Sequence, residues 1–278
     1  MDPDFDLDTY LHRLAYDGPR EATPAVLSAL CRAHPAAIPF ENIDPLLGCA
    51  PRLGVREVQA KLVGQQRGGY CFEHNALLRQ AVLALGFEVT SLAARVLWMA
   101  PAGLPVRPRT HILLMVDAGE RCIVDAGFGG HLVNVPLRLE PGLVQSSAVS
   151  DLRIAEAAAV FTLDTRLPDG WSPIYRFTLE PHQPADYEPL NWFTATHPMS
   201  IFRHNLLMER LTPTLRANLL NDSLTLRAAG EPPRVRRITD APEFERVMTD
   251  VFGLRLPVPA AELFERIPKN RDGIVLPP

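Results

Sequence analysis

Residues 67–75 read Arg-Gly-Gly-Tyr-Cys-Phe-Glu-His-Asn, and from Cys71 onward apolar residues recur at helical spacing as far as Gly86. The paired glycines favour a turn and Gly86 suits the position after a helix, so the pattern predicts a helix over residues 71–85. A cysteine in the first helical turn lies beside unpaired backbone N–H groups and the positive end of the helix dipole, which both favour its thiolate. Cys71 is therefore a candidate nucleophile, although a small apolar residue that fills the helix start would look the same.

The spacing of apolar residues changes at Gly86. Before it, caps and prolines predict further helices, one starting at Asp8, one running from Thr23-Pro24 to the residue before Pro35, and one over residues 55–63. After it, alternation predicts an antiparallel sheet or barrel with strands over residues 88–98, 111–116, 121–125, 157–164 and 173–179. The last third predicts strands over residues 206–211, 214–220 and 223–227, a helix from Asp240 to Gly253, and loops over residues 142–151 and 230–234.

The composition is that of an ordinary folded protein, with 278 residues, 47% hydrophobic residues, 22% charged residues and a net charge of −4. It excludes a disordered chain and provides no bulk charge that would attract nucleic acid or an anionic membrane. The acidic N-terminus lacks the basic start of a signal peptide, and no apolar run approaches the ~18 residues of a membrane span. We therefore expect a cytoplasmic protein without nucleic-acid or membrane partners, with its four cysteines reduced.

The segments around His111 and Asp125 predict a hairpin that joins the two side chains. His111 opens one apolar strand, Asp125 closes the next, and residues 117–119 lie between them. If those residues form a three-residue loop with Gly119 in the left-handed conformation, His111 lies directly opposite Asp125, with Cβ atoms ~4.5–5.5 Å apart. A four-residue loop would put the two on opposite faces. The carboxylate would orient the imidazole, whose cation stabilises a thiolate at Cys71; the alternative is a structural bond that braces the hairpin.

Two smaller motifs allow other chemistry. Cys31-Arg-Ala-His34 and Cys71-Phe-Glu-His74 could together form a Cys₂His₂ zinc site, but both lie in helices whose apolar faces need these positions, so we expect no metal. Directly after Asp125 comes Ala-Gly-Phe-Gly-Gly130, whose glycines would let the backbone approach a ligand and hold an anion. This run matches neither the GxGxxG motif nor the Walker loop, so it does not predict those types of nucleotide binding.

The stretch 67–75 closely resembles the active-site signature of arylamine N-acetyltransferases. Further blocks resemble the same family in the family's order: Ile38-Pro-Phe-Glu-Asn42, Thr110-His111, Val124-Asp-Ala-Gly-Phe-Gly129 and Asn191-Trp-Phe-Thr-Ala-Thr-His-Pro-Met-Ser-Ile-Phe202. They span most of the chain, whereas the last part resembles the family loosely. The resemblance implies an α+β fold with several domains and a papain-like arrangement of the cysteine triad. Its parts would be an N-terminal helical bundle with the nucleophile (1–86), a central antiparallel β-barrel with the histidine and aspartate (87–195), and a C-terminal α/β lid (196–278).

The resemblance also implies an activity. Acetyl-CoA, as cosubstrate, would acetylate the cysteine of a Cys71–His111–Asp125 triad, and an arylamine or arylhydrazine would take the acetyl group in a ping-pong reaction typical of xenobiotic metabolism. The apolar acceptor pocket would be lined by Phe40, Val96, Phe128 and Phe202. The CoA entrance would be lined by Thr110, Gly127, Gly129 and Gly130. The expected partners are small aromatic amines and hydrazines, CoA and, in a homo-oligomer, further copies of this chain.

Other matched residues have expected structural duties. Glu41 and Arg67 should form a buried pair that holds the Cys71 loop, and Asn75 should bond backbone near the site. His74 stands where many members have an apolar or amide residue. We expect His74 either to be exposed or to be a second imidazole, one turn from Cys71, that alters how readily the Cys71 thiol ionises.

Three other functions remain open. A macrolactam-forming amide synthase would share the triad, and acetyl-CoA hydrolysis with and without an aromatic amine would distinguish it. A cysteine hydrolase would have the same Cys, His, Asp order, but the sequence around Cys71 is not of the protease type. A binding protein that kept the fold would not need an intact triad.

Overall fold

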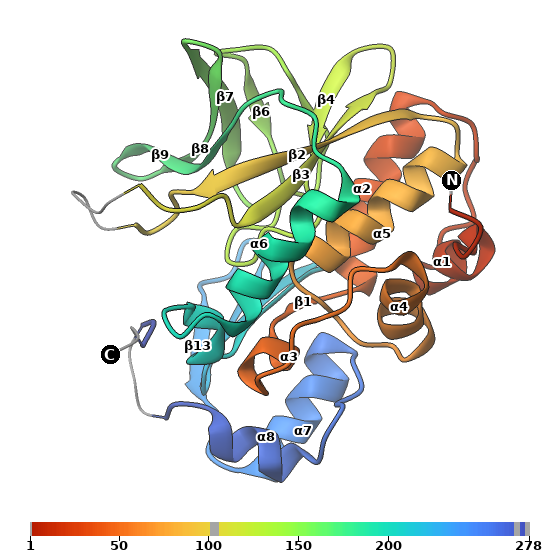
Figure 1. The fold of residues 1–278 in the computed structure, drawn as a ribbon. Helices are drawn as coiled ribbons and strands as arrows, with labels where there is room; N and C mark the ends of the chain where they lie inside the picture. The colour runs from red at the N-terminus through yellow and green to blue at the C-terminus, as the bar shows by residue number, and fades with distance from the viewer. Residues whose placement is uncertain (1, 101–105, 270–272, 276–278) are drawn as a thin grey trace.

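The computed structural model describes residues 2–100, 106–269 and 273–275. The N-terminal part is helical, and its last helix begins at Cys71 and packs against the strands that follow (Figure 1). The predicted helix over 71–85 is thus confirmed, within one residue at its end. The helices are α1 (Leu7–Arg13), α2 (Pro24–Ala37), α3 (Ile43–Leu46), α4 (Val55–Gln59), the π-helical η1 (Ala60–Gly64) and α5 (Cys71–Ala84).

Two helix boundaries differ from the prediction. Asp6, not Asp8, caps α1, because its carboxylate accepts a hydrogen bond from the Thr9 N–H at 3.0 Å. Helix α2 does not end before Pro35 but continues to Ala37. The next backbone bond, from the Ile38 N–H to the His34 carbonyl at 2.8 Å, closes its last turn. Proline removes only one backbone donor there, and the turn is otherwise held by its buried side chains.

The middle of the chain forms an eight-stranded antiparallel sheet that nearly closes into a barrel. Its order is β5-β4-β3-β2-β9-β8-β7-β6. The two edge strands are linked by the Gln145 side chain, which bonds the backbone N–H and carbonyl of Arg138 at 2.8 and 3.1 Å. The strands are β2 (Glu88–Val96), β3 (His111–Asp117), β4 (Arg121–Val124), β5 (Leu137–Arg138), β6 (Val144–Ser146), β7 (Asp151–Ala157), β8 (Val160–Leu167) and β9 (Gly170–Phe177).

The β3–β4 hairpin has a three-residue loop, but not the predicted one. Asp117 pairs with Arg121 and Leu114 with Val124, so the loop is residues 118–120. The Asp117 carboxylate accepts a hydrogen bond from the Gly119 N–H at 2.9 Å, which keeps Asp117 in the strand and moves the turn one residue along. The direct pairing of His111 with Asp125 is therefore wrong by two residues. An offset of two keeps both side chains on one face, so they still meet.

A second strand prediction also fails. The predicted strand over 157–164 crosses a turn, because Ala158 and Ala159 both have positive φ, 50° and 60°, and connect β7 to β8. Alanine gives no sequence signal for such a turn, which glycine or asparagine normally occupies. Part of the predicted 142–151 loop is strand β6, whereas the loop over 230–234 does separate two strands.

The C-terminal part forms a second antiparallel sheet of order β1-β10-β11-β12-β13. Strand β1 comes from the N-terminal part, so this sheet joins the two ends of the chain (Figure 1). The strands of this sheet are β1 (Phe40–Glu41), β10 (Leu207–Leu211), β11 (Leu215–Leu220), β12 (Ser223–Ala228) and β13 (Arg234–Arg237). The helices of this part of the chain are α6 (Pro184–Thr196), η2 (Ile201–Arg203), α7 (Ala241–Arg246), η3 (Val247–Phe252) and α8 (Ala260–Arg266). As predicted, Asp240 caps the helical segment that ends at Gly253.

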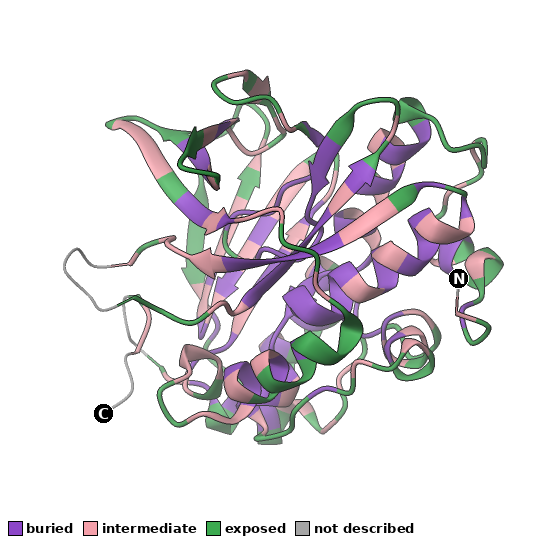
Figure 2. Ribbon diagram, turned by 45° about the horizontal axis from the view of Figure 1, so that its top comes forward, coloured by how far each residue is buried: buried purple, intermediate pink, exposed green. Residues whose placement is uncertain are grey.

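Three apolar cores lie within the helices, the barrel-like sheet and the C-terminal sheet, and a fourth cluster around Cys71 lies among them. Figure 2 shows buried residues along the central strands and the helices packed on them. The predicted division at residue 86 falls between α5 and β2, and the one at 195 falls in the last turn of α6. Among the described residues, no helix is long and apolar enough to cross a membrane.

Candidate active site

Cys71 is the first residue of α5 and is 4% exposed. Its Sγ lies 3.7 Å from the Thr110 carbonyl oxygen, so the helix start faces the beginning of β3. Gly127 packs on the Cys71 backbone from the other side, where an added Cβ would lie 2.7 Å from the Cys71 Cα. The thiol is thus fixed between the end of one strand and the loop that follows another.

His111 and Asp125 meet beside this thiol. The imidazole Nε2 lies 2.6 Å from Asp125 Oδ2, and both side chains are buried. Burial alone would lower the pKa of His111, but the Asp125 charge and hydrogen bonds to Asp125 and Cys71 raise it. Burial would raise the pKa of Asp125, but His111, Asn75 and the Gly127 N–H lower it. These shifts favour an imidazolium–carboxylate pair, and Cys71 is a further hydrogen-bond partner of the imidazole.

Asn75 bonds backbone near the site, as expected, and also bonds the Asp125 carboxylate, which was not expected. Its side-chain N–H group donates to Asp125 Oδ1 at 3.0 Å and to the Ile112 carbonyl at 2.8 Å, while its Oδ1 accepts from the Ala126 N–H at 3.1 Å. Asp125 Oδ1 also accepts from the Gly127 N–H at 3.0 Å. One amide thus links the helix of the nucleophile to both strands of the hairpin.

Tyr175 is a buried member of the site that sequence analysis missed. Its ring lies 5.1 Å from that of His111 and 5.4 Å from that of Phe128. Burial and the neighbouring Asp125 raise the pKa of its phenol well above the ordinary value. No motif marks Tyr175 within β9. Only the pairing of β9 with β2, which places Tyr175 opposite Val96, would have indicated that it lies in the site.

The four predicted pocket residues form two groups around the triad. Phe40 and Phe202 have ring centroids 6.2 Å apart and pack with Cys71. Phe128 meets the His111 ring edge-to-face at 5.1 Å, and Val96 packs in the same cluster as Phe128. Apolar rings therefore pack with Cys71 and with His111.

The predicted CoA residues lie at different depths: Gly127 is buried, Thr110 and Gly129 are half-buried, and Gly130 is exposed. Thr110 directly precedes His111, and Gly129 packs on the Phe40 ring, where a Cβ would lie 2.3 Å from Cε1. The Gly130 N–H is already engaged, because it donates to Glu209 Oε2 at 2.6 Å. Sequence analysis missed Glu209, which lies on β10 far along the chain.

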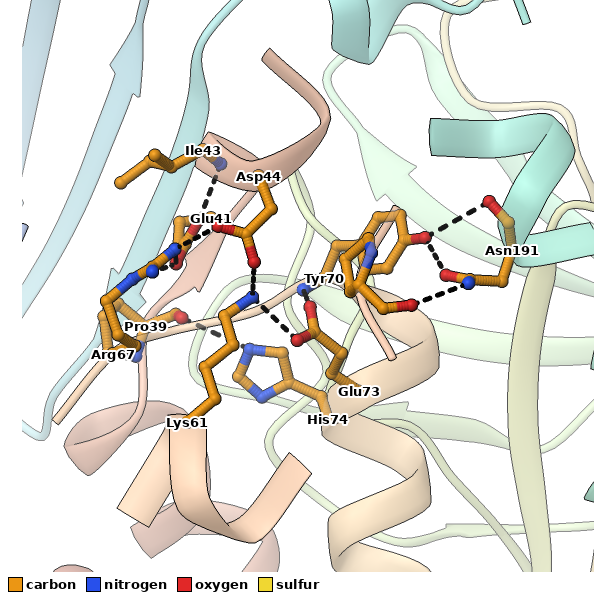
Figure 3. A network of polar contacts seen from close by, with 11 residues as sticks. Pro39, Glu41, Ile43, Asp44, Lys61, Arg67, Tyr70, Glu73, His74 and Asn191 are labelled. Atoms are coloured by element: carbon orange, nitrogen blue, oxygen red, sulfur yellow. Dashed lines mark hydrogen bonds and ion pairs between the residues drawn. The ribbon is translucent and has the colours of Figure 1, made fainter. Parts of the chain in front are cut away.

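A network of charges surrounds the turn before Cys71 (Figure 3). Arg67 lies 2.9 Å from Glu41 and 2.7 Å from Asp44, and Lys61 lies 2.7 Å from both Asp44 and Glu73. The predicted Glu41–Arg67 pair is therefore confirmed, as part of a larger set. Losing one partner of such a buried pair costs about 3–5 kcal/mol, because the other charge stays buried without compensation.

Tyr70 ties this turn to α6. Its hydroxyl donates to the Asn191 side-chain oxygen, and the Asn191 amide donates to the Pro51 carbonyl at 2.9 Å (Figure 3). Tyr70 and Asn191 belong to two separate sequence blocks of the resemblance, and both are buried. The hydrogen bond between Tyr70 and Asn191 brings the two blocks together beside Cys71.

The histidines of the two Cys-x₂-His motifs bond each other instead of lying apart. His34 Nε2 is 2.8 Å from His74 Nδ1, and both rings are completely buried. His74 is thus not exposed, and its Nε2 lies 3.2 Å from the Pro39 carbonyl oxygen. Among the described residues, no group of three or more His, Cys, Asp or Glu side chains is placed to hold a metal.

Comparisons with known proteins identify the family of this chain. The N-acetyltransferase family model matches residues 24–261. The arylamine N-acetyltransferase of Mycolicibacterium smegmatis is 38% identical over 255 residues, covering 90% of this chain and 92% of the relative. That of Escherichia coli is 37% identical over 250 residues, covering 89% and 88%.

Solved structures give the same result. The arylamine N-acetyltransferase of M. smegmatis superposes with a TM-score of 0.87 at 36% identity, covering 94% of this chain and 99% of that one. The Mycobacterium marinum enzyme in complex with CoA superposes with a TM-score of 0.86 at 35% identity, covering 94% and 96%. The chain therefore belongs to the arylamine N-acetyltransferase family of acyltransferases.

Proposed function

We propose that the protein transfers an acetyl group from acetyl-CoA to the nitrogen of arylamines and arylhydrazines through an acetyl-Cys71 intermediate. The observation that carries the proposal is the contact of His111 with Asp125 on one side and Cys71 on the other, at the start of α5. The M. marinum relative, whose structure contains CoA, supports acetyl-CoA as the donor.

In the first half-reaction the Cys71 thiolate attacks the thioester carbon. The bond from that carbon to the CoA sulfur breaks, and His111 Nδ1 gives its proton to the leaving sulfur. Asp125 keeps the Nε2–H of the remaining neutral imidazole, which fixes its tautomer. The products are acetyl-Cys71 and CoA.

In the second half-reaction the acceptor nitrogen attacks the acetyl carbon. The bond to the Cys71 sulfur breaks, and His111 Nδ1 takes the proton from nitrogen, which restores the starting ion pair. Arylamines and hydrazines keep a free lone pair at neutral pH, whereas most alkylamines are protonated. The rings of Phe40, Phe128 and Phe202 favour flat aromatic acceptors.

CoA would reach Cys71 past Thr110 and the glycines 127, 129 and 130. Gly129 and Gly130 are at least partly exposed, so a ligand can approach their backbone. Because the Gly130 N–H already bonds Glu209, Gly130 would offer close approach and not a free N–H.

The test is the release of CoA from acetyl-CoA, first without an acceptor and then with a panel of arylamines, hydrazines, N-hydroxyarylamines and alkylamines. We expect one equivalent of CoA per enzyme without an acceptor, turnover with aromatic acceptors, and parallel double-reciprocal lines. The N-hydroxyarylamine is included because the Salmonella typhimurium relative is also named an N-hydroxyarylamine O-acetyltransferase. Cys71→Ser should abolish the release, and Cys49→Ser should not. Intersecting lines, or full activity of Cys71→Ser, would contradict the acetyl-enzyme.

A further inference from the structure

Three buried side chains form a hydrogen-bonded chain that the proposed chemistry does not use. The Tyr10 hydroxyl lies 2.8 Å from His34 Nδ1, His34 Nε2 lies 2.8 Å from His74 Nδ1, and His74 Nε2 lies 3.2 Å from the Pro39 carbonyl. The side chains come from α1, α2 and α5 and are all 0% exposed. The chain therefore crosses the helical bundle and ends one residue before Phe40.

The direction of every bond in this chain is fixed by its last member. The Pro39 carbonyl can only accept, so His74 Nε2 carries the hydrogen and His74 Nδ1 accepts. His34 must then donate from Nε2 and accept the Tyr10 hydroxyl at Nδ1. Burial lowers the pKa of His74 to about 4 and the pKa of His34 well below its ordinary value, so both rings are neutral at pH 7.

The end of the chain coincides with a wall of the proposed acceptor pocket. The Phe40 ring lies nearly parallel to the His74 ring, with centroids 6.4 Å apart and planes at 9°. Phe40 also contacts Phe202, and the next residue, Glu41, donates its N–H to the Gly69 carbonyl at 2.7 Å. His74 thus holds the Pro39 carbonyl and supports the face of the Phe40 ring (Figure 3 shows the bond to Pro39).

We infer that His74 is a positioning residue for the acceptor, which acts through Pro39 and Phe40 and is itself oriented by His34 and Tyr10. The inference rests on the proposed function, because it assigns His74 to the second half-reaction only. Asn75 and Gly127 hold Asp125 by hydrogen bonds in which the His74 side chain takes no part, so we expect the triad to keep its geometry when this chain is broken. A merely structural role would instead affect both half-reactions together.

The experiment compares His74→Leu with His74→Gln. Leucine removes both hydrogen bonds and leaves the His34 N–H without its acceptor, whereas glutamine can accept from His34 with Oε1 and donate to Pro39 with Nε2. We expect His74→Leu to raise the KM for the aromatic amine about fivefold or more, since a lost hydrogen bond is worth ~1 kcal/mol. Its CoA release without an acceptor should stay within about twofold of wild type. His74→Gln should restore the KM.

Tyr10→Phe is the second variant, which deletes one hydroxyl at the far end of the chain. It should raise the amine KM in the same direction, by about twofold, since the donor to His34 is lost. Tyr16→Phe is the matched control, because the Tyr16 hydroxyl bonds the Pro19 carbonyl at 2.7 Å outside the chain. It should leave the KM unchanged.

Two results would overturn the inference: an unchanged amine KM in His74→Leu or Tyr10→Phe, or an equal loss of both half-reactions. If His74→Leu does not fold, Tyr10→Phe decides. A wild-type enzyme that releases no CoA without an acceptor would contradict the proposed function instead, so the two failures are distinct.

Discussion

Replacing Gly127 by alanine should slow the reaction strongly by moving the nucleophile. An added Cβ would lie 2.7 Å from the Cys71 Cα, 3.0 Å from the Cys71 carbonyl oxygen and 3.1 Å from the Asn75 amide. The first two atoms are backbone and cannot rotate away. Gly127 does not have a positive φ, so the backbone itself accepts alanine and only the extra carbon conflicts.

The size of the effect follows from those distances. Carbon atoms in contact lie ~3.5–4.0 Å apart, so the Cys71 backbone and the loop must separate by about 1 Å. Overpacking of this kind costs about 1–3 kcal/mol of stability. A misplacement of ~1 Å in a reacting group costs roughly 100-fold in rate. We therefore expect a folded enzyme whose acetylation is about 100-fold slower.

The assay is the rate of CoA release without an acceptor, measured beside the melting temperature. Gly64→Ala is the matched control, since it adds the same carbon where no atom lies within 4 Å. It should acetylate at the wild-type rate. A wild-type rate in Gly127→Ala, or an equal loss in Gly64→Ala, would refute the steric reasoning.

Iodoacetamide should modify Cys71 before the exposed Cys49, and preincubation with acetyl-CoA should protect only Cys71; mass mapping that finds the reverse order would count against the proposed nucleophile. Gly129→Ala should raise the amine KM and also slow CoA release, because its Cβ would lie 2.3 Å from the Phe40 ring on the proposed path of CoA; wild-type values for both would disagree. The pKa of His74 is lowered from 6.5 to about 4 on folding. As the pH falls, His74 is therefore protonated in the unfolded chain before it is protonated in the folded protein. Its contribution to the free energy of unfolding is fully present above pH ~6.5 and is lost toward pH 4, with about 2 kcal/mol lost by pH 5. The melting temperature should fall from pH 7 to 5, and less in His74→Gln; equal slopes would refute this.

Local patterns were enough to predict the helix of the nucleophile and the face shared by His111 and Asp125. The helix follows from the spacing of apolar residues after Cys71. The shared face follows from the three-residue loop, because a register shift of two residues leaves both side chains on the same face. The register of that hairpin could not be read from loop length alone. It depends on whether the Asp117 side chain bonds the loop, which adds one residue to the strand without any change of composition.

Contacts between distant segments could not be predicted in this way. Nothing in the spacing of Tyr10, His34 and His74 indicates that three helices place them in one line. The Cys-x₂-His motifs allowed a zinc site, which we did not expect, and did not indicate that His34 and His74 bond each other, because spacing reports which residues share a helix face and not what that face meets. The turn at Ala158 was missed for a similar reason, since the sheet on either side imposes its left-handed conformation.

Glu209 shows how the C-terminal sheet enters the active site. Its buried carboxylate bonds the Gly130 N–H at 2.6 Å and Arg216 at 2.7 Å, and Arg216 donates to the Gly130 carbonyl at 3.0 Å. In the sheet, Glu209 is also the register partner of Phe40. One residue thus contacts the loop that follows Asp125 and the strand that carries Phe40. The part of the chain that resembles the family least therefore contacts both the loop after Asp125 and the strand of Phe40, so its place in the fold depends on bonds that no local sequence pattern indicates.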